Sequence, residues 1–186
     1  TPLHFAIIVK QEDIALKLIE RLQSSPDQLN VVDKNGRTPL HLAIENEQIN
    51  VAMKLIEASP DQLNNYGNIL LHLAIKKKQT DIAMKLIELL KELPNQINVK
   101  DKSSGTPLHC AIENGQTDIA MKLIENLQAS PDQLSVLDDF REMPLYYAIR
   151  HVQPEVAMKL IECLKASPHQ LSVLNEDGYT PLHCAI

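Results

Sequence analysis

Histidine, cysteine and carboxylate side chains carry the chemistry available to this sequence, and their spacing argues against catalysis. Five of the seven histidines directly follow a leucine, namely His4, His41, His72, His109 and His183. A side chain that recurs once per copy of a repeated segment is typical of a structural role, because every copy must fit the same neighbours. No CxxC, no HExxH and no Cys/His set with zinc spacing is present.

The carboxylates follow the same repetition. Glu20, Glu57, Glu88, Glu125 and Glu162 end five near-identical segments, so we expect them to be solvated helix ends. No motif brings a nucleophile together with a base and an orienting partner. Neither GxGxxG nor GxxxxGK[ST] occurs, so no phosphate-binding loop is indicated. We therefore predict a chain that is not an enzyme and that holds no cofactor and no metal.

Composition narrows the class of partner. The net charge of -6 disfavours general nucleic-acid binding, which needs a basic face that displaces counterions from phosphates. No run of about 18 apolar residues is present, so we predict no membrane insertion. Cys110, Cys163 and Cys184 are expected to be reduced thiols in an intracellular, cytoplasmic compartment.

An internal repeat organises the chain. A Leu-His pair begins at Leu3, Leu40, Leu71, Leu108 and Leu182, with Leu145-Tyr146 as a variant, and successive steps are 37, 31, 37, 37 and 37 residues. A second block follows at a fixed offset and reads DIALKLIE, NVAMKLIE, DIAMKLIE twice and EVAMKLIE. One copy cannot bury its own apolar faces, whereas stacked copies bury each other's.

Each copy predicts two helices. Thr followed by Pro, as at Thr106, is a helix start, because Thr caps the free N–H groups and Pro at the first position has none to lose. In the second helix, Ile119, Ala120, Leu123 and Ile124 share one face. This helix is predicted to extend to a Leu such as Leu22, Leu90, Leu127 or Leu164, before Ser-Pro stops the chain from continuing as a helix.

The sequence resembles the ankyrin repeat family through TPLHxA at Thr1, Thr38, Thr106 and Thr180, Gly115 of ENGQTD and the LIE segments. The resemblance covers essentially the whole chain. It implies an all-α solenoid of about five stacked helix pairs and a partial terminal repeat, with short β-hairpin or turn loops. The single predicted domain, 1–186, divides into repeats at approximately 1–32, 33–63, 64–100, 101–137, 138–174 and, in part, 175–186.

Departures from the family pattern lead to further expectations. The usual period is about 33 residues, so the longer steps imply extra residues after the second helix, with Leu29, Leu63, Leu134 and Leu171 tucked beneath the next layer. The 31-residue step implies an inward notch on the outer side. Left-handed turns are expected at Gly115 and also at Lys10, Glu47, Lys78 and Val152. The layer that starts at Met143 lacks the Thr, and we expect it to be the most irregular.

The family's mode of binding implies which residues contact a partner. Hairpin tips and the exposed ends of first helices are expected to line the concave face. Carried onto this sequence, these positions give Lys34, Asn35, Arg37, Glu45, Asn46, Tyr66, Asn68, Lys76, Lys77, Lys102, Glu113, Asn114, Phe140, Glu142, Arg150, His151 and Tyr179. In the family, the His of each Leu-His pair hydrogen-bonds backbone and ties neighbouring loops together.

Tyr66, Phe140 and Tyr179 are half of the chain's aromatic residues, and we expect them at exposed tips, where aromatic anchors often dominate binding energy. The alternative is that these rings fold back over a loop. A run of three lysines, Lys76, Lys77 and Lys78, has two interpretations. It is either a solvated helix end or a positively charged patch that steers an acidic partner.

The leading hypothesis is a scaffold that binds a partner protein. The alternative is the targeting arm of a larger enzyme, or of a secreted bacterial effector acting in a host cell on a host protein. Both ends of the sequence fall inside a motif, so we expect a longer parent protein. Because capping repeats are missing, the end layers are expected to fray or to associate end to end with another copy.

Overall fold

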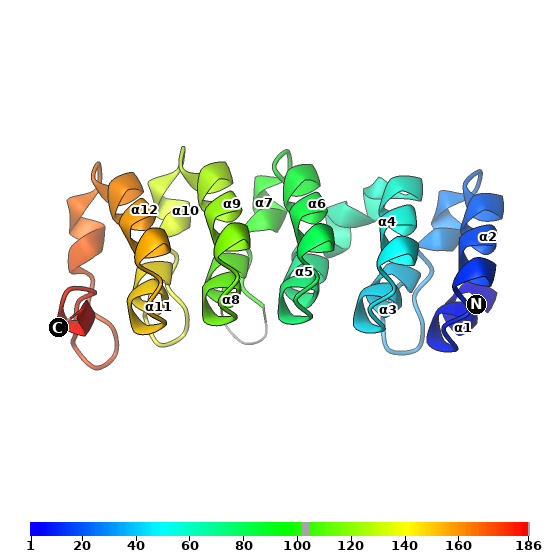
Figure 1. Ribbon diagram of the computed structural model, residues 1–186. Helices are drawn as coiled ribbons and strands as arrows, with labels where there is room; N and C mark the ends of the chain where they lie inside the picture. Colours follow the sequence, from blue (N-terminus) through cyan, green and yellow to red (C-terminus); the bar gives the residue numbers. More distant parts are fainter. Residues whose placement is uncertain (102–104, 186) are drawn as a thin grey trace. The chain divides into compact units, whose positions relative to one another are not determined.

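The computed structural model describes residues 1–101 and 105–185. It divides into two compact units, Thr1–Leu86 and Ile87–Ile186, and each is built from pairs of antiparallel helices stacked side by side (Figure 1). The described residues contain no β-strand. No helix in this part of the chain is long and apolar enough to cross a bilayer.

Unit 1 contains three layers of paired helices. Its elements are α1 (Pro2–Ile8), α2 (Glu12–Leu22), η1 (Pro26–Leu29), α3 (Pro39–Glu45), α4 (Ile49–Ala58), η2 (Pro60–Gln62), α5 (Leu63–Lys76) and the greater part of α6 (Thr80–Leu90). First helices pack on first helices, α1 on α3 and α3 on α5, and α2 packs on α4. This arrangement buries the apolar faces that each pair leaves open.

Unit 2 repeats the arrangement. After the end of α6 it contains α7 (Pro94–Ile97), α8 (Pro107–Glu113), α9 (Thr117–Leu127), α10 (Pro131–Leu134), α11 (Pro144–Arg150), α12 (Pro154–Leu164), η3 (Pro168–Ser172) and η4 (His183–Ala185). Here α8 packs on α11 and α9 on α12. The core is aliphatic, and the side chains of Ile119, Ala120, Leu123 and Ile124 are fully buried as predicted.

Both ends of the predicted helices are confirmed. Thr38 and Thr106 accept the backbone N–H of the His three residues later, and the His side chain accepts the N–H of the Thr, which completes a capping box. The long second helices end at Leu22, Leu90, Leu127 and Leu164, the four leucines expected. Sequence-local capping and Pro signals therefore set these boundaries.

The extra residues of the long period form a short third helix. The Pro after each helix stop begins one turn, in η1, η2, α7, α10 and η3, where the sequence indicated a tucked loop. Leu29, Leu63 and Leu134 are buried as predicted. Leu171, in η3 of the last layer, is only half-buried.

The structure corrects the expectation about which layer is irregular. The helix after Met143, α11, is seven residues long, as α3 and α8 are, so that layer is regular despite its missing Thr cap. The irregular layer is that of α5, which has 14 residues. The shortened 31-residue step leaves no room for a loop, and the chain passes from η2 directly into α5.

Five non-glycine residues adopt left-handed backbone geometry, and four of them are in the predicted turns: Lys10, Glu47, Lys78 and Val152. Arg141 is the fifth, and it lies where the loops of two other layers have Gly36 or Gly178. Val152, with a φ of 53°, is the most unfavourable because its β-branched side chain crowds the backbone in this region.

Replacing Val152 by Gly is expected to raise the free energy of unfolding by about 1 kcal/mol. The side chain is 83% exposed, so its removal sacrifices little packing, and the relief of left-handed strain exceeds the entropic cost of Gly. Urea denaturation measures the change. Gly115→Val is the matched control, since Gly115 holds the same turn one layer earlier with a φ of 70°, and it should destabilise the protein. A Val152→Gly variant no more stable than the parent would contradict the strain.

Candidate protein-binding surface

Short loops precede the first helices and share one geometry. The loop from Asp33 to Arg37 closes with the N–H of Asp33 donating to the carbonyl of Arg37, at 2.9 Å. Equivalent bonds close the loops 101–105, 138–142 and 175–179. The carboxylate of Asp33 accepts the N–H groups of Asn35 and Arg37, and mainly the Arg37 bond lowers the pKa of Asp33 to about 2. Of the two expected forms, β-hairpin or turn, the described loops are turns.

Histidines tie two of these loops to the layer before them. Nδ1 of His109 accepts the N–H of Thr106 at 3.2 Å, so the neutral ring carries its proton on Nε2. That Nε2 donates to the carbonyl of Glu142 in the next loop, at 3.0 Å. His4 reaches the carbonyl of Arg37 in the same way, at 3.1 Å. The expectation that these histidines are structural is supported by both contacts.

Tyr146 performs the same task where the sequence has Tyr in place of His. Its ring is fully buried, and its hydroxyl lies 2.6 Å from the carbonyl of Tyr179 and 2.5 Å from that of Val173. Tyr179 occupies the loop position that corresponds to Glu142. A phenol therefore replaces an imidazole as the tie between layers.

A loop residue and the end of the first helix form an ion pair in both units, with the charges exchanged. In unit 1, Arg37 contacts Glu45 at 2.8 Å, and its guanidinium also contacts Asp33 at 2.8 Å. In unit 2 the equivalent pair is Glu142 and Arg150. Each pair pins the loop to the helix of its own layer.

Two aromatic side chains project from neighbouring loops of unit 2. Phe140 is 63% exposed and Tyr179 is 52% exposed. The backbone of Phe140 is held on both sides, since its N–H donates to Asp138 Oδ1 at 2.9 Å and its carbonyl accepts the N–H of Glu176 at 3.1 Å. Phe140 is thus an exposed ring on an ordered support.

The end of α11 adds a cluster around Tyr147. The Tyr147 hydroxyl donates to Asp138 at 2.8 Å, and burial together with this bond raises the pKa of Tyr147. His151 stacks on the ring with centroids 6.1 Å apart, and the Arg150 guanidinium lies 5.6 Å from the ring centroid. This cluster is next to the loop that carries Phe140. Unit 2 therefore presents aromatic and cationic groups together.

A sequence model of the ankyrin family, described as "Ankyrin repeats (3 copies)", matches residues 3–100, 54–135 and 84–169. The chain belongs to the ankyrin repeat family. Its fold is an all-α ankyrin-repeat solenoid, and ankyrin repeats are generally modules for protein–protein interaction. A comparison with curated proteins finds no match.

Solved structures share the ankyrin fold at low sequence identity. A structure of EF0377, an ankyrin repeat protein, is 21% identical with a TM-score of 0.70, and covers 98% of this chain and 89% of that one. A chain is 23% identical, with a TM-score of 0.67, in the structure of the Bd0816 predatory endopeptidase from Bdellovibrio bacteriovorus in complex with the immunity protein Bd3460. The match covers 98% of this chain and 89% of that one. The ankyrin repeat domain of Bcl-3 is 21% identical with a TM-score of 0.56, and the match covers 100% of this chain and 94% of that one.

Most of the predicted partner-binding residues of this ankyrin chain lie at the surface. Exposed members are Lys34, Asn35, Lys76, Lys77, Glu113, Phe140, Arg150, His151 and Tyr179, and half-buried members are Arg37, Glu45, Asn46 and Asn114. The amides of Asn46 and Asn114 each donate to a carbonyl of the same helix, at 2.8 Å. Whether these residues bind a partner stays a prediction.

Three predicted positions are wrong, and a fourth lies outside the described residues. Tyr66 and Asn68 were expected at a hairpin tip, but both lie in α5, and the Tyr66 ring is half-buried edge-on to His41 at 5.3 Å. Glu142 is only 5% exposed, because Arg150 and the amide of Asn175 both contact its carboxylate. Lys102 lies outside the described residues.

The repeat also contains a structural glutamine that the sequence reasoning did not single out. The buried amide of Gln48 donates to the carbonyl of Ile7 in the preceding layer at 2.6 Å, and Gln79 reaches Ile44 at 2.6 Å. Gln153 makes the equivalent bond at 2.5 Å. A Gln at one fixed position in every copy, directly before the second helix, was the available signal.

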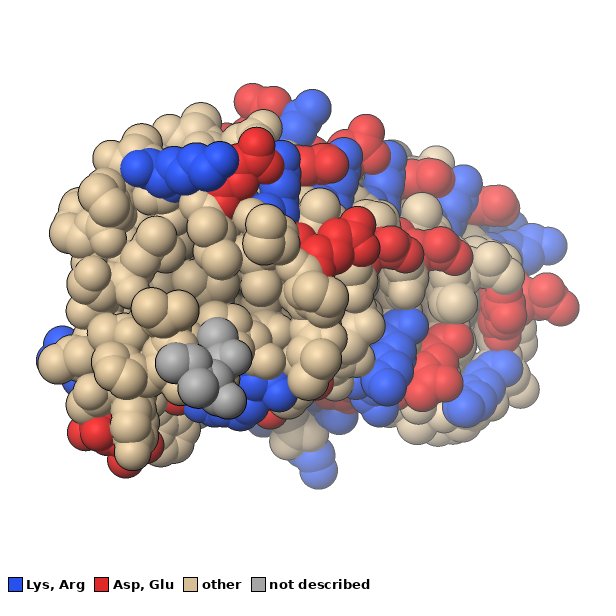
Figure 2. Space-filling model, turned by 60° about the vertical axis from the view of Figure 1, so that its left-hand side comes forward, with Lys and Arg blue, Asp and Glu red and all other residues tan. Residues whose placement is uncertain are grey.

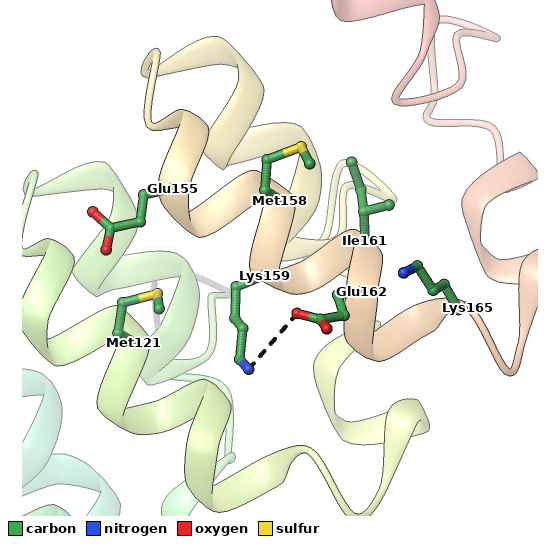
Figure 3. Close-up of a pocket in the computed structure, with 7 residues that line it drawn as sticks. All are labelled: Met121, Glu155, Met158, Lys159, Ile161, Glu162 and Lys165. Atoms are coloured by element: carbon green, nitrogen blue, oxygen red, sulfur yellow. Dashed lines mark ion pairs between the residues drawn. The ribbon is translucent and has the colours of Figure 1, made fainter.

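A separate pocket lies on the second helices of unit 2. Figure 3 shows Met121 of α9 facing a hollow bordered by Met158, Lys159 and other residues of α12, where Lys159 pairs with Glu162 of the same helix with 3.9 Å between the charged atoms. None of the predicted partner-binding residues lines this pocket. In the described part of the chain, no three His, Cys, Asp or Glu residues gather as metal ligands would.

The end of unit 2 that carries the C-terminus is poor in charge. Figure 2 brings this end forward and shows a broad area without Lys, Arg, Asp or Glu. Leu174, Leu182 and Met158 are exposed in the last layers of the unit. Association of this end with another copy stays a prediction.

Proposed function

We propose that the chain is a protein-binding module and that its loop-and-first-helix surface in unit 2 holds the partner. The observation that carries the proposal is Phe140, a largely exposed ring whose backbone is fixed by Asp138 and Glu176. A rigid aromatic side chain binds with little loss of conformational entropy, which favours a role as an anchor. Tyr179 on the next loop supplies a second exposed ring.

The electrostatics favour an acidic group of the partner at the end of α11, whereas the loops that carry the two rings expose Asp139, Glu176 and Asp177. Arg150 and His151 are both exposed at the end of α11, beside the half-buried ring of Tyr147. The opposing carboxylate of Glu142 is buried and already bonded, so Arg150 remains the accessible charge of the pair. The three cysteines are thiols, which supports an intracellular location.

Replacing Phe140 and Tyr179 together by Ala is expected to weaken partner binding at least about thirtyfold, because truncation of an anchor costs about 2 kcal/mol or more. The purified chain is immobilised, partners are captured from the cells that express it, and the bound protein is identified by mass spectrometry. Binding of that protein to both forms is then measured by calorimetry. Equal affinities would contradict the proposed site.

The matched control replaces Ile14 and Met158 by Ala. Both are exposed apolar residues on second helices, so the double substitution removes apolar surface without touching a loop or a first helix. Circular dichroism and urea denaturation confirm that both variants stay folded. The alternative role as a targeting arm stays a prediction, which the full open reading frame tests.

A further inference from the structure

The series of loops is interrupted in unit 1. The loop from Asp33 to Arg37 precedes α3, but no loop precedes the corresponding part of α5, because η2 continues directly into that helix. In the other layers the loop supplies backbone groups that the neighbouring layer binds. The groups that would bind the missing loop therefore need a different partner.

His41 is the clearest of these groups. Its Nδ1 accepts the N–H of Thr38 at 3.2 Å, so the proton of the neutral ring is on Nε2. In His4 and His109 the equivalent Nε2 donates to a carbonyl of the next loop. For Nε2 of His41, the described chain contains no acceptor within hydrogen-bonding distance, although the residue is only 6% exposed. Solvent reaches this nitrogen, because it is not among the fully buried side-chain atoms of the described chain that lack a partner, so an acceptor from outside the chain can bind it in place of water.

The loop edge beside His41 presents the complementary group. In unit 2 the carbonyl of Phe140 accepts the N–H of Glu176 from the adjacent loop, at 3.1 Å. Asn35 occupies the position of Phe140 in its own loop, and no donor in the described chain reaches its carbonyl. One edge thus offers an N–H donor at His41 and a C=O acceptor at Asn35, the two kinds of group that a peptide backbone pairs with.

Lysines supply exposed charge beside this edge. Helix α5 contains no Asp or Glu, and Lys77, directly after it, is exposed. Lys34 is exposed on the loop, whereas the nearby carboxylates of Asp33 and Glu45 are both engaged by Arg37. An acidic segment is therefore favoured over a basic one.

We propose that this edge of unit 1 binds an acidic loop of a protein partner, which takes the place of the missing loop and supplies a backbone carbonyl to His41 Nε2. The proposal rests on the protein-binding role described above and assigns it a second contact, distinct from Phe140 and Tyr179. The half-buried ring of Tyr66, edge-on to His41, forms one wall of the site.

The probe is a cyclised synthetic peptide with the sequence of residues 136–144, VLDDFREMP. This acidic loop already gives the Glu142 carbonyl to His109 in unit 2, so it contains the backbone group in question. NMR follows solvent exchange of the Nε2 protons of His41 and His109 in the whole chain. We expect faster exchange at His41 than at His109 without peptide, and about fivefold slower exchange at His41 with millimolar peptide.

Two controls make the result specific. In the first variant, residues 64–70 are replaced by the sequence of residues 30–39, which restores a loop and should protect His41 without peptide and abolish the peptide effect. In the second, the peptide carries Asp138→Asn and Asp139→Asn and should bind more weakly. Exchange at His41 that is already as slow as at His109, or that the peptide leaves unchanged, overturns the proposal. Loss of partner capture through Phe140 and Tyr179 is measured separately, so the two proposals fail independently.

Discussion

Acidification from pH 7 to pH 4 is expected to destabilise the folded protein by about 3 kcal/mol for each of His41 and His109. Burial lowers the pKa of both imidazoles from the usual 6.5 to about 4. For His109 the hydrogen bond to the Glu142 carbonyl opposes this shift without cancelling it. Nδ1 of each ring also accepts a Thr N–H, a bond that protonation would abolish.

The direction follows from which state takes up the protons. Above pH 6.5 both rings are neutral in the folded and unfolded chains, and the stability that they contribute is fully present. Between pH 6.5 and pH 4 the unfolded chain binds protons that the folded chain does not, so the free energy of unfolding falls as the pH falls. Below pH 4 the folded rings also titrate and this loss levels off. Urea denaturation at half-unit intervals of pH measures the slope.

The matched variant is His109→Tyr, because Tyr146 already fills the equivalent place in the layer of α11. A phenol does not titrate in this range. The slope between pH 6 and pH 4.5 should therefore decrease by about 1.2 kcal/mol per pH unit relative to the parent. Carboxylates contribute equally to both proteins and cancel in the difference. An unchanged slope would show that His109 does not resist protonation in the folded state.

Replacing Gln79 by Glu is expected to destabilise the protein by about 3 kcal/mol or more at neutral pH. The Gln79 amide donates to the Ile44 carbonyl at 2.6 Å in a buried setting. A carboxylate there would bring an unpaired charge into the core and direct it toward a carbonyl oxygen. Burial should raise the pKa of the introduced Glu. The penalty is therefore present above that pKa and is relieved as the pH falls and the acid becomes a donor.

Gln79→Met separates the charge from the lost hydrogen bond. It has a similar length and no charge, and the Ile44 carbonyl still accepts the N–H of Glu47 at 3.1 Å, so we expect a loss of only about 1 kcal/mol, independent of pH. Chemical denaturation of the parent and both variants at pH 7 and pH 5 gives the comparison. Similar losses for Glu and Met would show that the amide is not in a buried contact.

Local signals predicted most of the helical framework. Thr38 and Thr106 begin helices because the cap, the Pro and the following His lie within four residues of each other. The long second helices end at the predicted leucines for the same reason, since Pro acts on the residue directly before it. Interactions that span a few residues can be read from one sequence without knowledge of the neighbouring layer.

Features that depend on two layers were predicted less well. The position of Tyr66 was wrong because the shortened step changed the path of the whole connection, so an alignment of motifs placed a loop where α5 now lies. Glu142 was placed at the surface because its type is usually exposed, whereas its burial depends on Arg150 and Asn175 from two different segments. The exposure of Phe140 was predicted correctly, because it depends on the single loop that contains this residue.

The exchanged ion pairs, Arg37 with Glu45 and Glu142 with Arg150, constrain how the layers diverged after duplication. A single reversal at either position would set two like charges against each other, and an intermediate with one neutral partner avoids this repulsion. The intervening copies still hold such combinations, Asn68 with Lys76 and Gly105 with Glu113. A neutral residue at the first position lets the two charges of the pair be exchanged one at a time. Each copy can therefore acquire its own arrangement of charges at this position without changing the others.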